Sequence, residues 1–91
     1  MDYIIKADGT KTEVSPLNNI NYSLKEMKDI VGGYIEILQD LTTNQSVMVV
    51  NEEGKLKGLA FNKEGTQILR SWGYDDFVVG DVLLCSSDRI K

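Results

Sequence analysis

Four consecutive apolar residues, Val47 to Val50, lie near the middle of the chain. A strand with one exposed face alternates apolar and polar residues, and this run does not alternate. It therefore predicts a β-strand that is covered on both faces. The chain has 91 residues, a length at which folding buries roughly two-thirds of the surface of the unfolded chain. We therefore expect a single domain, residues 1–91, with one modest core.

Local signals in the first third of the chain predict a hairpin and a helix. Asp8-Gly9 suits a tight turn between two short β-prone runs, residues 3–7 and 10–14. Ser23 and Glu26 have the spacing of a capping box, so a helix is expected to begin at Ser23. Gly32-Gly33 is expected to end it. The apolar positions of this helix recur at helical spacing and are Leu24, Met27, Ile30 and Val31.

The rest of the chain predicts further strands and one more helix. Residues 34–38 and 47–50 flank a polar turn and are expected to form a second hairpin, with residues 55–59 as the next strand. Asn62 is expected to cap a helix over residues 63–72. The β-prone runs 77–79 and 82–85 complete the pattern. It predicts an α+β fold, with a mostly antiparallel sheet of about five to six strands and two helices.

The residue types that are missing exclude most catalytic chemistry. The sequence has no histidine and one cysteine, Cys85. Nucleophile pairs and zinc sites that need histidine are therefore excluded, as are an intramolecular disulfide and a cysteine cluster. Ser-Lys catalysis and paired carboxylates are not excluded by these absences. Asp75, Asp76 and Asp81 lack the spacing of a calcium loop and are interpreted as acids of surface turns. We expect a protein that is not an enzyme and that has no cofactor and no metal site, with Cys85 in the core.

The charge balance disfavours binding to duplex nucleic acid. The chain has ten basic and 14 acidic residues, which gives a formal net charge of −4. This sign is opposite to the one that attracts a phosphate backbone. Residues 1–6 lack the pattern of a signal peptide, and no apolar run approaches the roughly 20 residues that span a bilayer. The expected location is the cytoplasm, with no membrane contact.

Three motifs occur in a specific order and spacing: V-G-G-Y-I-E from Val31, N-E-E-G-K-L-K-G-L-A-F-N from Asn51 and V-G-D-V-L-L from Val79. Together, over about residues 24–85, they make the chain resemble a small domain-of-unknown-function family of bacteriophages and bacterial mobile elements. The resemblance implies an anti-defence role by occupancy. The leading interpretation is a homo-oligomeric, noncatalytic protein that sequesters a host immune nucleotide of the cyclic nucleotide or cyclic ADP-ribose type. The alternative is an inhibitor that occludes a host defence enzyme with an acidic surface containing Glu52, Glu53, Asp75 and Asp76.

The segment from residue 51 to residue 63 carries the residue types that a nucleotide requires. Phosphate binds cations and free amides, a base stacks on an aromatic ring, and amide side chains hydrogen-bond to its edge. Tyr34 and Glu36 share a strand face and are added as part of a pocket or subunit seam. The candidate ligand-binding residues are Asn51, Lys55, Lys57, Phe61, Asn62, Lys63, Tyr34 and Glu36.

Each candidate also has a structural interpretation. Lys55 and Lys57 fit the outward positions of a solvated hairpin, and Asn62 fits an ordinary helix cap. Simple solvent exposure explains Tyr34 and Glu36 equally well. Gly32-Gly33 lacks the surrounding residues of a phosphate loop, so a helix stop is the favoured interpretation.

Overall fold

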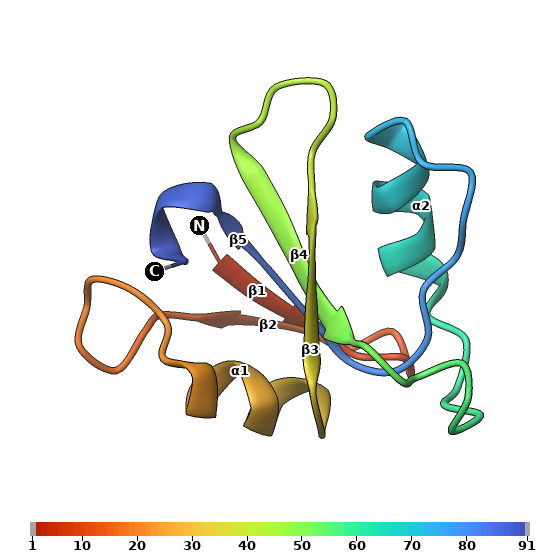
Figure 1. The fold of residues 1–91 in the computed structure, drawn as a ribbon, viewed down its shortest axis with the longest axis horizontal. Helices are drawn as coiled ribbons and strands as arrows, with labels where there is room; N and C mark the ends of the chain where they lie inside the picture. The colour runs from red at the N-terminus through yellow and green to blue at the C-terminus, as the bar shows by residue number, and fades with distance from the viewer. Residues whose placement is uncertain (1, 91) are drawn as a thin grey trace.

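The computed structural model describes residues 2–90, which form one five-stranded antiparallel sheet and two α-helices (Figure 1). In chain order the elements are β1 (Asp2–Ile5), β2 (Lys11–Val14), α1 (Leu24–Val31), β3 (Ile35–Gln39), β4 (Ser46–Asn51), α2 (Lys63–Ser71), β5 (Val82–Ser86) and a short 3-10 helix (Ser87–Arg89). The order of strands in the sheet is β2-β1-β5-β4-β3. The predicted α+β class, the two hairpins and the two helices are confirmed.

Strand β4 is buried on both faces, as its sequence predicts. Each residue from Val47 to Val50 is at most 5% exposed. Figure 1 shows α1 and α2 on opposite sides of the sheet, and alternate strand residues pack toward each helix. The core residues on the α2 side are Ile5, Met48, Val50, Leu69, Trp72, Val78 and Val82. Those on the α1 side are Tyr22, Met27, Val31, Val47, Val49, Leu83 and Cys85.

Both helices begin at the predicted caps. Ser23 Oγ accepts the Glu26 amide at 3.1 Å, and the Glu26 carboxylate accepts the Ser23 amide at 2.8 Å, which completes the capping box. Gly32 ends α1 with a φ of 81°. One predicted core position is wrong: Leu24 is 58% exposed, because the first residue of α1 faces a surface groove instead of the sheet.

The predicted strand at residues 55–59 does not form. Backbone hydrogen bonds from Lys57 to Glu53, from Gly58 to Lys55 and from Leu59 to Gly54 wind this segment into consecutive turns. Gly58 has a φ of 67°, which an L-residue rarely adopts and which a strand does not allow. Lys55 and Lys57 are therefore not alternate positions of a hairpin strand. This places the end of the Lys55 side chain against a neighbouring segment, as described below.

Residues 77–79 also remain outside the sheet. Within residues 2–90, an isolated bridge between Phe61 and Val79 is all that gives this run β character. The Val78 amide donates to Thr66 Oγ1 of α2 at 3.0 Å, and the Val78 carbonyl accepts the Asn62 amide at 2.9 Å. Because these groups pair with α2 and its cap, the run lies along the helix instead of joining a strand.

Cys85 lies in β5 and is 2% exposed, as predicted. Burial raises the pKa of its thiol to about 12, and the nearby Asp2 carboxylate acts in the same direction. Since the thiolate is the reactive form, we expect Ellman's reagent to modify the native protein at least about a hundredfold more slowly than protein unfolded in guanidinium chloride. Equal rates in the two states would contradict this burial.

Candidate functional site

A cavity of about 320 Å³ lies on the α2 side of the sheet, beside the ends of β3 and β4. The turn segment after β4 forms one wall, and residues 74–79 form the other. The lining residues are Glu36, Leu38, Val50, Asn51, Glu52, Lys55, Leu56, Tyr74, Asp76, Phe77, Val78 and Val79. This cavity, which we call the β3/β4 cavity, forms within one chain.

The floor of the β3/β4 cavity is apolar and belongs to the core. Val50 and Val78 are buried in the α2-side cluster, and Leu38 packs against them. Gly54 allows the turn segment to approach, because a Cβ at this position would lie 2.9 Å from Val79 Cγ2. The hydrophobic core thus continues directly into a surface recess.

The charges around the cavity are mainly negative. Its lining contains Glu36, Glu52 and Asp76 but only one cation, Lys55. Lys55 Nζ lies 2.6 Å from Asp76 Oδ1 and 4.2 Å from the centre of the Phe77 ring. The hydrogen bond from Lys55 lowers the pKa of the Asp76 carboxyl, and the Phe77 amide adds to this effect. Lys55 therefore bridges the two walls at the mouth of the cavity.

Three of the eight predicted site residues line this cavity: Glu36, Asn51 and Lys55. Asn51 is 7% exposed, and its amide has a structural role. Its Nδ2 donates to the Val31 carbonyl at 3.1 Å, and its Oδ1 accepts the Glu53 amide at 2.8 Å. These bonds join the end of β4 to α1 and to the turn segment, so Asn51 shapes the cavity.

Asn62 and Lys63 lie at a second, shallower cavity of about 290 Å³, together with Lys6 and Gln67. Asn62 is 1% exposed. Its Nδ2 donates to the carbonyls of Ile5 and Gly80, both at 2.9 Å, while its Oδ1 accepts the Gly65 amide at 2.8 Å. Both Nδ2 donors and the Oδ1 acceptor of Asn62 are hydrogen-bonded within the fold, so its role as a helix cap and core residue explains this side chain.

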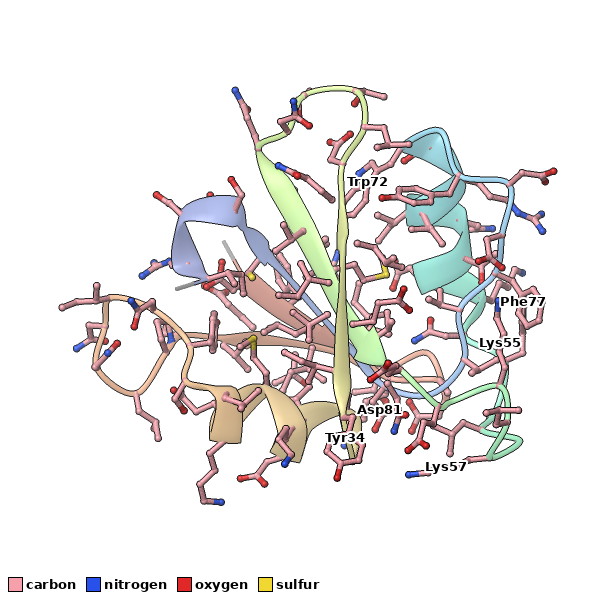
Figure 2. The ribbon with its side chains drawn as sticks, viewed as in Figure 1. Tyr34, Lys55, Lys57, Trp72, Phe77 and Asp81 are labelled. Atoms are coloured by element: carbon pink, nitrogen blue, oxygen red, sulfur yellow. The ribbon has the colours of Figure 1, made fainter. Side chains whose placement is uncertain are left out.

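The other three predicted residues lie outside the β3/β4 cavity. Phe61 is 54% exposed and contacts Phe77, with the ring centres 6.2 Å apart. Lys57 Nζ lies 3.6 Å from a Glu53 carboxylate oxygen. Figure 2 shows Lys55 beside Phe77, whereas Tyr34 and Lys57 lie at the lower end of the molecule. The single site predicted within residues 51–63 is thus divided among separate surfaces.

The prediction missed one whole wall of the β3/β4 cavity, residues 74–79. A signal for this wall is present in the sequence, because glycines flank it. Gly73 has a φ of 102° and Gly80 a φ of 74°. Two glycines around a short run with Tyr74, Phe77 and Asp76 are typical of a loop with exposed aromatic and acidic side chains. Tyr74 donates its hydroxyl to the Gln39 carbonyl at 2.8 Å, which joins this wall to β3.

Within residues 2–90, no three histidine, cysteine, aspartate or glutamate side chains are placed to hold a metal ion. No helix of this range is long and apolar enough to cross a membrane.

The fold and the cavity define a small α+β protein with one antiparallel sheet between two helices and a recess of small-ligand size at the end of its central strands. The chain belongs to the family described as Domain of unknown function (DUF3846), whose model matches residues 1–90. This agrees with the resemblance to a domain-of-unknown-function family. No curated protein and no solved structure matches the chain.

Proposed function

We propose that this protein acts without catalysis, by sequestering a small nucleotide-type ligand in the β3/β4 cavity. The observation that carries the proposal is the combination of an apolar floor, an aromatic ring and carboxylates in one recess of about 320 Å³. Small-molecule sites are largely apolar recesses of this size with a few polar groups. The resemblance to phage proteins makes host immune nucleotides the first class to test and an anti-defence role the expected outcome.

The arrangement suits the base end of such a ligand. Leu38, Val50 and Val78 offer an apolar surface to a base, and Phe77 offers a ring for stacking. Among residues 2–90, the Glu36 and Glu52 carboxylates have no side-chain hydrogen bond and no ion pair within the chain. Ionised carboxylates accept hydrogen bonds from N–H groups such as those on the edge of guanine or adenine.

The same charges restrict the ligand. Three acidic residues and one lysine line the cavity, so a ligand with many negative charges is repelled there. Lys55 is also paired with Asp76, and a phosphate has to compete for it. We therefore propose that the base enters the cavity and that the phosphate stays at the mouth, beside Lys55.

This geometry bears on two expectations from the sequence, the homo-oligomer and the alternative function. The predicted homo-oligomer is not needed to build this cavity, because the cavity forms within one chain; oligomerisation stays a prediction. The alternative function is inhibition of a host enzyme by an acidic surface, and this surface is less negative than its four acids alone suggest. Two of its four acids, Glu53 and Asp76, are paired with lysines.

Calorimetric titration with a panel of cyclic mononucleotides, cyclic dinucleotides and cyclic ADP-ribose isomers tests the proposal. We expect at least one member to bind and to be recovered intact. Phe77→Ala is expected to weaken binding about tenfold, since stacking on an aromatic ring contributes about 1–3 kcal/mol per base. Phe61→Ala is the matched control, because Phe61 is a similarly exposed ring that contacts Phe77 but does not line the cavity.

Failure of the whole panel to bind folded protein would refute the proposal. Equal losses of affinity in Phe77→Ala and Phe61→Ala would place the ligand elsewhere. Conversion of a bound ligand to a product would contradict a noncatalytic role.

A further inference from the structure

Strand β3 is an edge of the sheet, and its hydrogen-bond pattern shows which backbone groups face outward. The Tyr34 carbonyl accepts the Glu52 amide, and the Asp40 amide donates to the Ser46 carbonyl, each at 2.9 Å. In an antiparallel pair, alternate residues bond to the partner strand. Residues 34, 36, 38 and 40 therefore face β4, and the N–H and C=O groups of Ile35, Ile37 and Gln39 face away from the sheet.

This edge is open along part of its length. The Gln39 carbonyl accepts the Tyr74 hydroxyl at 2.8 Å. Within residues 2–90, no hydrogen-bond partner lies on the outward groups of Ile35 and Ile37. The opposite edge, β2, carries exposed Lys11 and Glu13, and charged side chains of this kind protect an edge from pairing. The β3 edge carries one charged residue, Glu36, and has an isoleucine at its centre.

The two faces of β3 differ in chemistry. On the α1 side, Ile35 and Ile37 line a groove of about 500 Å³ together with Tyr22, Leu24 and Met27. Ile37 is 41% exposed and Leu24 is 58% exposed, so this apolar surface faces solvent. On the α2 side, the strand presents the unpaired carboxylate of Glu36 to the β3/β4 cavity.

We propose that the β3 edge binds an extended segment of a partner protein, which adds to the sheet as a sixth, antiparallel strand. Apolar residues of this segment lie opposite Ile35 and Ile37, on the groove side. A lysine or arginine between them lies opposite Glu36, where the carboxylate complements its charge. The bound motif is therefore apolar-basic-apolar. This inference does not rest on the nucleotide proposal, although both use the Glu36 carboxylate.

A second copy of the chain fits this edge poorly. Antiparallel pairing of two β3 strands around Ile37 puts Leu38 of one copy opposite Glu36 of the other. It also makes the two Glu36 carboxylates diagonal neighbours, between chains that each carry a net charge of −4. Charge complementarity thus favours a basic partner segment.

Fluorescence anisotropy with a labelled, end-blocked peptide Thr-Val-Val-Lys-Val-Thr tests the proposal. We expect saturable binding to the full chain. Replacing the peptide lysine with glutamate should weaken binding at least about threefold, and Glu36→Lys in the protein should reverse this preference. N-methylation of the second valine, which lies opposite Ile37, should abolish binding because it removes a backbone donor.

Ile37→Pro removes one outward N–H and no bond to β4, so the variant is expected to fold and to bind at least about tenfold more weakly. Glu13→Pro is the matched control on the β2 edge, and it should bind normally; circular dichroism checks both folds. Three results would overturn the proposal: no binding to folded protein, equal binding of the lysine and glutamate peptides, or a dimer that Ile37→Pro dissociates.

Discussion

Replacing Asn62 with alanine is expected to lower the free energy of unfolding by about 3–5 kcal/mol, measured by chemical denaturation. Asn62 is 1% exposed, and its amide makes three hydrogen bonds, to Ile5, Gly65 and Gly80. These bonds connect β1, the first turn of α2 and the segment before β5. Alanine removes these three bonds from the interior, and each buried backbone group that is left without a partner costs about 1–3 kcal/mol.

Two further variants identify the cause of this loss. Ser23→Ala removes the exposed cap of α1 and is expected to cost only about 1 kcal/mol. Asn62→Asp retains an acceptor for the Gly65 amide but lacks the two donors, so it should remain strongly destabilised. If Asn62→Ala costs no more than Ser23→Ala, then Asn62 acts as a simple helix cap, and the bonds across the core contribute little.

Thr66→Val is expected to lower the free energy of unfolding by about 2 kcal/mol, although it hardly changes the side-chain volume. Thr66 is 3% exposed, and its Oγ1 accepts the Val78 amide at 3.0 Å. Valine leaves this buried N–H unpaired, a cost of about 1–3 kcal/mol. The Val78 carbonyl keeps the Asn62 amide as its donor. Thr66 Oγ1 also donates to the Val78 carbonyl at 3.4 Å, so the main loss is the shorter bond from the Val78 amide, one of the bonds that hold residues 74–79 to α2.

Thr12→Val on the exposed β2 strand is the matched control, and it should change stability by less than about 0.5 kcal/mol. Thermal and chemical denaturation of both variants provides the comparison. Since Val78 lines the β3/β4 cavity, Thr66→Val should also lower the affinity for any ligand that binds there. Equal stability of the two variants would show that the Thr66 hydroxyl does not hold this wall.

Features that depend on neighbouring residues were predictable. The turn at Asp8-Gly9, the capping box at Ser23 and the cap at Asn62 all involve residues within three or four positions, so the residue types alone indicate them. The apolar run from Val47 to Val50 predicts a doubly covered strand for the same reason. The prediction of a strand at residues 55–59 was wrong. It relied on a weak alternation of lysine and leucine, whereas the glycines of this segment favour turns.

The candidate site was only partly predictable, because distant segments form it. Glu36 and Phe77 line one cavity although they lie far apart in the sequence. Asn62, in contrast, is chemically suited to a ligand but is buried among backbone groups of β1 and the segment before β5.

Turns, caps and the burial of β4 thus follow from residue types at short range, where a few backbone torsions and the hydrophobic effect act locally. The composition of the β3/β4 cavity and the open edge at Ile37 follow from the strand order β2-β1-β5-β4-β3. That order depends on packing and hydrogen bonds between residues far apart in the chain. No local pattern contains these contacts, so the positions of Glu36, Lys55 and Phe77 relative to one another came from the folded structure.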